Sequence, residues 1–299
     1  MATALTRLVM AVATVAATAC SIDVRGDEAV VREERRFAVG ADLELTVSTF
    51  DGALEVLSWD RPEVLVEIER RAASGGDAQA LEVTAEQQGN RLIIDAPRPA
   101  RSGGDSVIQL GGSRSPSVNF RVTVPSRLTL DARTGDGAVA ARDLAGRITL
   151  RTADGAVNTD RLAGAVLVDS GDGAVIVRDV RGALDLHTGD GAVNVSGRLE
   201  ALRIVTGDGP VRIDAAEGST MTSEWTVESG DGAITVRLPP AFEAEIDAQS
   251  ADGRITVEGL ATATPSNDDD RPAQLRTTLG KGGQLLRLRT GDGPITIDR

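Results

Sequence analysis

The sequence predicts an all-β protein: a β-solenoid (β-helix) with about 18 residues per coil and an irregular N-terminal β cap. Aromatic residues make up only 2% of the 299 residues and tyrosine is absent, which suits a narrow core of small aliphatic side chains. Apolar and polar residues alternate with the period of a strand. A Gly-Asp-Gly or Ala-Asp-Gly turn also recurs at a spacing of 18 residues, at Asp136, Asp154, Asp172, Asp190 and Asp208.

Residues 1–20 are typical of an export signal. Arg7 precedes a short apolar run that is about the length of a signal-peptide core and too short to span a bilayer. The run ends in Ala-Thr-Ala-Cys, which resembles a bacterial lipobox except for alanine where leucine is preferred. Cys20 is the only cysteine of the chain and is the expected lipidation site, through which the lipid would anchor the mature chain to a membrane. The alternative is an ordinary signal peptide with Cys20 incidental.

Residues 21–38 are highly charged, and we expect a tether that leads into the first strand. Residues 39–130 contain alternating segments, including Leu43–Val47 and Ala53–Leu57, and one short helix is expected at Ala78–Leu81. A solenoid end exposes unpaired strand edges that must be covered. We therefore expect residues 39–130 to be a β cap that is continuous with the solenoid.

Residues 131–299 are the predicted Gly-Asp-Gly repeat solenoid. Each repeat supplies two short strands and two tight turns, and a second glycine marks the midway turn. Aligning the copies at 18 residues produces apolar columns that would stack inside a core, such as Val139, Val157, Val175, Val193 and Val211, or Ile148, Val166, Leu184 and Leu202. The rival geometry is a stack of antiparallel hairpins with Asp-Gly at the turns.

The repeat loosens after Gly209. Further turn aspartates follow at irregular spacing, at Asp231, Asp252 and Asp292. Residues 261–273 include three consecutive aspartates and are expected to form an extruded loop. The segments 285–288 and 294–297 are expected to form the last coil of the solenoid.

The turn aspartates are the candidate functional residues: Asp136, Asp154, Asp172, Asp190, Asp208, Asp231, Asp252 and Asp292. In a solenoid they would stack as a ladder about 4.8 Å apart. The structural interpretation is an Asx turn, in which the glycines supply positive φ and the carboxylate accepts a backbone N–H. The functional interpretation is a weak cation or glycan contact. Calcium takes about six to eight oxygen ligands, and one aspartate per coil offers few, so we assign no metal.

The lipobox-like start, the alternating N-terminal half with Asp51-Gly52-Ala53-Leu54-Glu55-Val56 and the repeated Gly-Asp-Gly-Ala-Val-x-Val together resemble the DUF4097 family of adhesin-like bacterial envelope proteins. The resemblance covers the chain from about residue 38. It implies a β-helical, adhesin-like surface or periplasmic protein and carries no catalytic residue. Some relatives are associated with envelope-stress regulation, so the resemblance also implies a second possible role.

Composition argues against two other classes of function. The net charge of −13 opposes nucleic-acid binding, which requires a basic surface. His187 is the only histidine, in a column expected to face outward, and Cys20 is assigned to lipidation, so neither a catalytic triad nor a zinc cluster is expected. We expect no enzyme activity and no cofactor.

These observations predict a non-catalytic, lipid-anchored cell-envelope protein with an adhesin-like or scaffolding role. Its partners would be the membrane, through the N-terminal lipid, and a glycan or an envelope protein. It would be exported to the cell envelope and lipid-anchored, at the outer membrane or at the cell surface or in the periplasm. The alternative is a periplasmic envelope-stress sensing or regulatory module. A calcium-dependent, polysaccharide-acting solenoid enzyme is a distant third.

Overall fold

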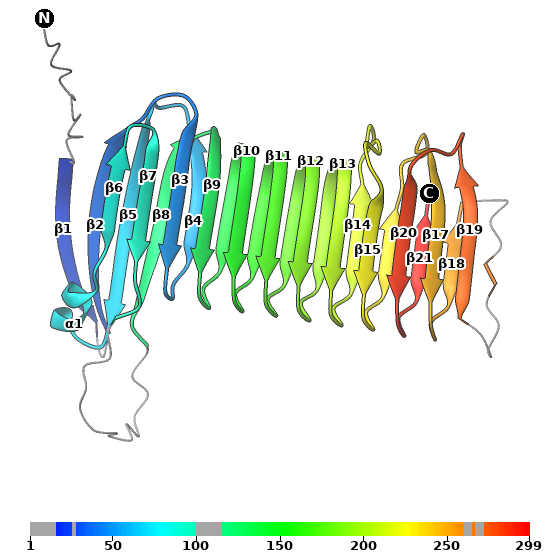
Figure 1. Cartoon of the computed structure of the whole chain (residues 1–299). Coiled ribbons are helices and arrows are strands. Elements are labelled where there is room, and N and C mark those ends of the chain that lie inside the picture. Colours follow the sequence, from blue (N-terminus) through cyan, green and yellow to red (C-terminus); the bar gives the residue numbers. More distant parts are fainter. Residues whose placement is uncertain (1–15, 26–27, 100–114, 260–264, 267–271) are drawn as a thin grey trace, which may run out of the picture.

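The computed structural model describes residues 16–25, 28–99, 115–259, 265–266 and 272–299. It is a β-solenoid, as predicted (Figure 1). Strand β10 (Val139–Thr152) pairs in parallel with β11 (Val157–Ser170), and each residue faces the residue 18 positions later. Strands β12 (Val175–Thr188) and β13 (Val193–Thr206) continue this ladder, with a bulge near Gly197. This parallel pairing excludes the antiparallel hairpin stack.

Each of these long strands bends in the middle, so that its two halves lie in two facing sheets. In β10 the bend falls at Asp143, with φ of 59°, and at Gly146, with φ of 128°. Positive φ strains most residues but not glycine, which explains the midway glycine of each repeat. The apolar columns of both halves face inward, and Val139, Ile148 and Leu150 have no exposed surface.

We call the sheet that contains the first halves, residues 139–142 in β10, sheet 1. Four strands at its N-terminal end pair antiparallel with one another, and the others pair in parallel. Its order is β1 (Ala16–Arg25), β2 (Glu28–Ala38), β5 (Glu63–Ala72), β8 (Ser117–Pro125), β4 (Leu54–Trp59), β10 to β13, β14 (Val211–Ala215), β16 (Ile234–Arg237), β21 (Ile295–Asp298) and β18 (Ile255–Glu258).

Sheet 2 contains the second halves, residues 145–152 in β10. It is closed at each end by an antiparallel strand. Its order is β6 (Thr84–Gln88), β7 (Arg91–Ala96), β3 (Leu43–Thr49), β9 (Arg127–Thr134), β10 to β13, β15 (Trp225–Ser229), β20 (Leu285–Thr290), β17 (Ala244–Ser250) and β19 (Ala273–Leu279).

The tether expected over residues 21–38 is wrong: residues 21–25 lie in β1, and residues 28–38 form β2, which pairs with β5 from Ala29 to Ala38. The sequence of β2 does not show the alternation of apolar and polar residues expected of a strand, because charged residues stand at two of its inward positions. Val31 and Phe37 are buried there, but Glu33 and Arg35 lie between them and form an ion pair at 2.6 Å. Arg70 of β5 also pairs with Glu33, at 2.8 Å. Mutual pairing therefore permits charges at positions where a strand pattern requires apolar residues.

The short helix exists as α1 (Gly75–Ala80), and the side chain of Ser74 accepts the N–H of Asp77 at its start. Its Ala78 packs in a small apolar cluster with Val31 and Ala72. The described strands of residues 39–130 pair into sheets 1 and 2 together with the repeat array. Most of the expected loop 261–273 lies outside the described residues. No described helix is long and apolar enough to cross a membrane.

The expected position of the last coil is wrong. Strand β20 lies between β15 and β17, and β21 lies between β16 and β18 (Figure 1). The coil that is last in the sequence is therefore inserted between two coils that precede it. The connection from β16 to β17 passes over the inserted coil. Neighbouring coils share one pattern of inward residues, so sequence periodicity alone does not specify their spatial order.

Candidate functional site

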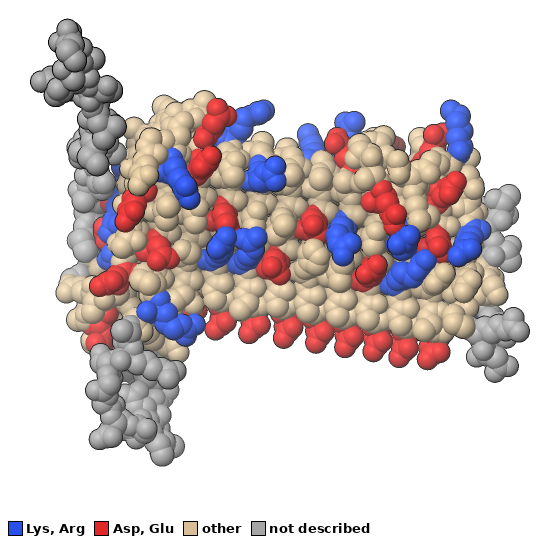
Figure 2. Space-filling view, in the orientation of Figure 1, with Lys and Arg blue, Asp and Glu red and all other residues tan. Residues whose placement is uncertain are grey.

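The turn aspartates form one row along an edge of the solenoid. Each turn leads from a strand of sheet 2 to a strand of sheet 1, and Figure 2 shows acidic side chains lined up along the lower edge of the molecule. All eight predicted aspartates are exposed. Because of the inserted coil, Asp292 lies between Asp231 and Asp252. Asp51 extends the row beyond Asp136, since Thr49 pairs with Thr134 and Leu54 with Val139.

A buried hydroxyl column holds these turns. Two residues before each aspartate stands a threonine or serine whose exposed fraction is at most 8%. The Thr152 hydroxyl accepts the N–H of Gly155 at 3.0 Å and lies 3.0 Å from the carbonyl oxygens of Gly135 and Gly137 in the preceding coil. From Thr134 onward each hydroxyl donates to a carbonyl oxygen of a neighbouring turn, whereas Thr49 lies within hydrogen-bonding distance of the carbonyl oxygens of Asp51 in its own turn and Val118 in β8. The column comprises Thr49, Thr134, Thr152, Ser170, Thr188, Thr206, Ser229, Ser250 and Thr290.

This column corrects the expected Asx turn in three of the turns. There the N–H of Gly155, Gly232 or Gly253 donates to the hydroxyl of Thr152, Ser229 or Ser250, and not to the turn aspartate. The sequence contained the signal, because a threonine or serine stands two positions before every turn aspartate. A turn built by the hydroxyl leaves the carboxylate free to face solvent.

The turn glycines also have a different cause from the one expected. Positive φ occurs at the midway glycines and not at Gly137 or Gly155. A Cβ at Gly155 would overlap the carbonyl oxygen of Gly137 in the adjacent coil. Adjacent turns therefore stack too closely for any side chain, and this contact keeps the aspartates at the spacing of paired strands, about 4.8 Å.

The carboxylates lean along the row. The Asp190 carboxylate accepts the backbone N–H of Asp208 at 3.2 Å. A Cβ at Gly207 would lie only 2.5 Å from Asp190 Oδ1, so the side chain sits over the first glycine of the next turn. Among the described residues, no group of three or more His, Cys, Asp or Glu side chains could hold a metal ion. The row is a repeated surface of single carboxylates.

His187 faces outward, as predicted. It pairs with Asp169 and Val205 in the neighbouring strands, and its side chain is 42% exposed. Its Nδ1 lies 3.5 Å from Asp185 Oδ1. The environment is that of a surface side chain.

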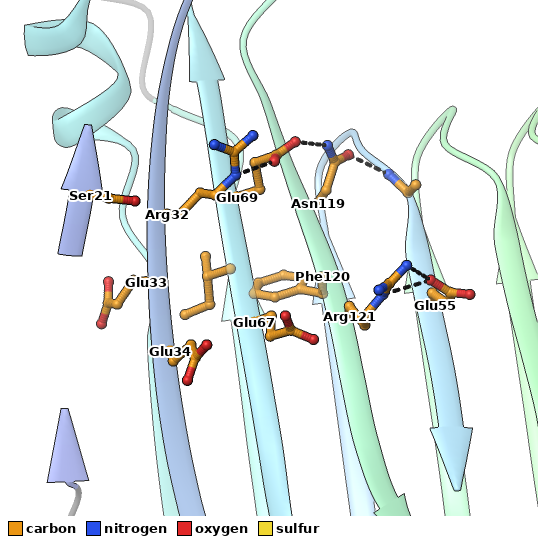
Figure 3. Close-up of a pocket in the computed structure, with 12 residues that line it drawn as sticks. Ser21, Arg32, Glu33, Glu34, Glu55, Glu67, Glu69, Asn119, Phe120 and Arg121 are labelled. Carbon is orange, nitrogen blue, oxygen red and sulfur yellow. Dashed lines mark hydrogen bonds and ion pairs between the residues drawn. The ribbon is translucent and has the colours of Figure 1, made fainter. Parts of the chain in front are cut away.

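A second polar site lies on the outer face of sheet 1, over β2, β5, β8 and β4. It is a groove of about 530 Å³ that includes Glu34, Glu67, Arg121 and Glu55, which face one another in successive strands (Figure 3). Arg121 pairs with Glu55 at 2.8 Å. Glu34 and Glu67 lie directly opposite each other, an arrangement that repels.

In the upper part of the groove, Glu69 of β5 connects to both neighbouring strands. It accepts hydrogen bonds from Arg32 at 2.9 Å and Asn119 at 3.3 Å (Figure 3). Burial raises the pKa of Glu69, but hydrogen bonds from Arg71, Arg32 and Asn119 outweigh it and hold the pKa below its usual value. The groove could not be predicted from the sequence, since its residues come together only through strand pairing.

Cys20 lies in β1, and its side chain is outside the described part of the structure. The residues that precede β1 are outside it as well. The export signal and the lipid anchor therefore stay predictions.

Three solved structures are similar to this chain. One is described as "a putative cell adhesion protein" from Clostridium sporogenes ATCC 15579, with 13% identity over 89% of this chain and 99% of that chain and a TM-score of 0.27. A "putative adhesin" from Bacteroides fragilis NCTC 9343 has 11% identity, coverage of 89% and 96%, and a TM-score of 0.33. A "putative lipid binding protein" from Parabacteroides distasonis ATCC 8503 has 12% identity, the same coverage and a TM-score of 0.42.

At these identities and TM-scores, the similarity to the three structures supports no conclusion about function. No match was found among curated proteins. The sequence profile of one family, described as Toastrack DUF4097, matches residues 66–298, which is most of the chain. The match includes the hydroxyl column from Thr134 onward and all eight turn aspartates, and it agrees with the resemblance seen in the sequence. This chain therefore belongs to the DUF4097 (Toastrack) family.

Proposed function

We propose that this protein is a non-catalytic, lipid-anchored component of the bacterial cell envelope that acts as an adhesin. The observation that carries the proposal is the row of exposed turn aspartates. Its spacing is set by backbone stacking and its turns are held by buried hydroxyls, so the carboxylates are arranged in a row before any ligand binds. A rigid surface loses little conformational entropy on binding, which favours weak contacts repeated many times.

The chemistry of the row favours a repetitive ligand. Single carboxylates about 4.8 Å apart accept hydrogen bonds from hydroxyl groups and attract cationic groups. A glycan with regularly spaced hydroxyl or amino groups can contact several coils at once. An anionic polymer would be repelled unless cations bridged the two surfaces. We therefore propose a neutral or basic glycan as the ligand.

A non-catalytic role is supported by the residues themselves. His187 is a surface side chain, and Cys20 is assigned to the anchor. The carboxylates of the row are exposed and spaced as neighbours along one edge, which does not create the unequal environments that acid–base pairs need.

The ligand test uses purified protein and immobilised polysaccharides, one basic, one neutral and one acidic. A variant with Asp154, Asp172, Asp190 and Asp208 changed to Asn should lose most retention on the basic and neutral surfaces. The matched control changes Asp160, Asp169, Asp185 and Asp214 to Asn, which removes the same charge from the sheet faces and should retain binding. Equal loss in both variants would refute a specific role of the row.

The location test uses protease treatment of intact cells, with a Cys20→Ala control. An adhesin should be digested from outside, and the Cys20→Ala protein should be released in soluble form. Protection until the envelope is permeabilised would exclude adhesion to external surfaces.

That second outcome would favour the alternative role, a periplasmic sensing or regulatory module. One observation supports it: the polar groove of Figure 3 lies next to β1, the strand that contains Cys20. An envelope partner bound there would sit close to the proposed anchor. Loss of partner capture in an Arg121→Ala variant, with the aspartate row intact, would distinguish this role from adhesion.

A further inference from the structure

The inserted coil, residues 285–298, occupies a slot whose two walls match each other. One wall is formed by β15 and β16, and the other by β17 and β18. In sheet 2, Val227 and Ala248 both face Leu288. In sheet 1, Ile234 and Ile255 both face Ile295. The two walls are therefore already in register with each other.

The hydroxyl column would also survive loss of the insert. Thr290 lies 3.2 and 2.9 Å from the carbonyl oxygens of Gly230 and Gly232. Ser250 lies 3.3 and 2.9 Å from those of Gly291 and Gly293. Since the two turns have the same geometry, Ser250 could take the acceptors that Thr290 holds.

The length and composition of the connections around the slot are compatible with removal of the insert. In β10 the connection between the two sheets is short, since Gly146 follows Arg142 by four residues. The corresponding connection from β16 to β17 is longer, since Ala244 follows Arg237 by seven residues. The extra residues, which include Pro239, cross over the inserted coil. The insert itself follows β19 through a glycine-rich segment, residues 280–284, in which three glycines have positive φ.

The polar contacts at the slot are incompletely satisfied. Arg287 Nε and Asp298 Oδ1 of the insert, and Asp247 Oδ1 of the adjacent β17, are buried without a hydrogen-bond partner. An ion pair at 2.9 Å joins Arg289 to Asp247. Trp225 of one wall packs against Phe242 of the connection between β16 and β17, with ring centroids 5.1 Å apart.

We propose that residues 285–298 form a removable coil, and that the solenoid has a second closed form in which β15 and β16 pair directly with β17 and β18. In this form the solenoid is one coil shorter and the segment that follows Gly283 is free. Free strands add to sheet edges, so the released segment is available for pairing elsewhere. The exchange is a conformational device that does not depend on the function proposed above.

The test uses the full chain with Cys20→Ala and two reporter cysteines, Glu228→Cys and Gln249→Cys. These positions flank Arg289 in successive strands. With the coil inserted they lie two strand spacings apart, roughly 9–10 Å, beyond the Cα separation of about 7 Å that a disulfide tolerates. A positive control, Thr226→Cys with Arg287→Cys, joins adjacent strands and should form its disulfide readily.

The insert is then destabilised by Leu288→Asp and Ile295→Asp, which place charges at fully buried positions. The 228–249 disulfide should form at least tenfold faster than in the parent, with the strand signal in circular dichroism largely retained. A matched pair in an ordinary coil, Leu186→Asp with Val193→Asp, should not accelerate this disulfide. Failure of the Leu288 and Ile295 variant to form the disulfide, or its loss of β structure, would overturn the proposal.

Discussion

The hydroxyl of Thr152 accepts the backbone N–H of Gly155 at 3.0 Å, and this one bond shapes the turn that carries Asp154. The same hydroxyl reaches the turn carbonyls of the preceding coil. One side chain thus satisfies polar backbone groups in two successive turns, in a place that water does not reach. The exposed aspartate row is a consequence of this buried column.

Replacing Thr152 by valine keeps the shape of the side chain and removes its hydroxyl. The Gly155 N–H and a carbonyl oxygen of the adjacent turn then lose a partner, which should lower the free energy of unfolding by about 1–3 kcal/mol. Urea unfolding followed by circular dichroism measures the change. Thr152→Ser keeps the hydroxyl and should lose less than Thr152→Val. Thr149→Val, on the outer face of the same strand, should be nearly neutral; equal losses at positions 149 and 152 would contradict this role.

Replacing Gly155 by alanine should be more harmful than a glycine-to-alanine change usually is. The added Cβ would overlap the Gly137 carbonyl oxygen, which is backbone and cannot move aside. The two coils must separate locally, so we expect a loss above about 2 kcal/mol. Gly75→Ala is the control, since a Cβ there meets no atom within 4 Å. A neutral Gly155→Ala, measured by the same urea unfolding, would show that close stacking does not require glycine at this position.

The repeat itself could be predicted from sequence because solenoid coils pair with their neighbours in register. A column such as Val139, Val157 and Val175 is therefore both a sequence period and a stacked row in the core. The order of the last coils could not be predicted. Ile234, Ile295 and Ile255 are the same residue in the same column, and nothing in their local sequence says which pair is adjacent.

The alternation of apolar and polar residues also failed to predict a strand where paired charges occupy its inward positions. Glu33 and Arg35 hide the alternation of β2, and Arg70, the second partner of Glu33, is 37 residues away in the sequence. The exposed aspartates of the candidate site were predicted, but the role of the threonine or serine two positions earlier was not, although these residues recur with the repeat. The groove was not, since Glu67 and Arg121 meet only through the pairing of β5 with β8.

Neutralising one aspartate of the row should stabilise the fold at low ionic strength. Asp172 lies between Asp154 and Asp190, and like charges at the strand spacing repel. Asp172→Asn should therefore raise the urea midpoint at low salt, and the gain should shrink as salt screens the charges. Asp252 has one turn neighbour, Asp292, among the described turns, so Asp252→Asn should gain less. A gain independent of salt would mean that charge repulsion is not its cause.

The Glu33 cluster should make stability depend on pH. Burial raises the pKa of Glu33, but hydrogen bonds and charge from Arg35 and Arg70 outweigh it, so the pKa lies below the usual 4.5. A carboxyl whose pKa is lowered by folding stabilises the folded state above its unfolded pKa, and this stabilisation is lost as pH falls through the lowered value. Glu33→Gln should therefore be less stable than the parent at neutral pH, and the difference should shrink below about pH 4.5.

Urea midpoints of the parent and Glu33→Gln between neutral pH and about pH 3 measure this difference directly. Other acidic groups titrate in both proteins, so their effects cancel when the two curves are subtracted. Glu82→Gln is the control, because Glu82 is exposed, and its curve should run parallel to that of the parent. A Glu33→Gln difference that stays constant with pH would show that the loss comes from altered packing. A difference that closes in acid assigns the stabilisation to the ionised carboxylate held between Arg35 and Arg70.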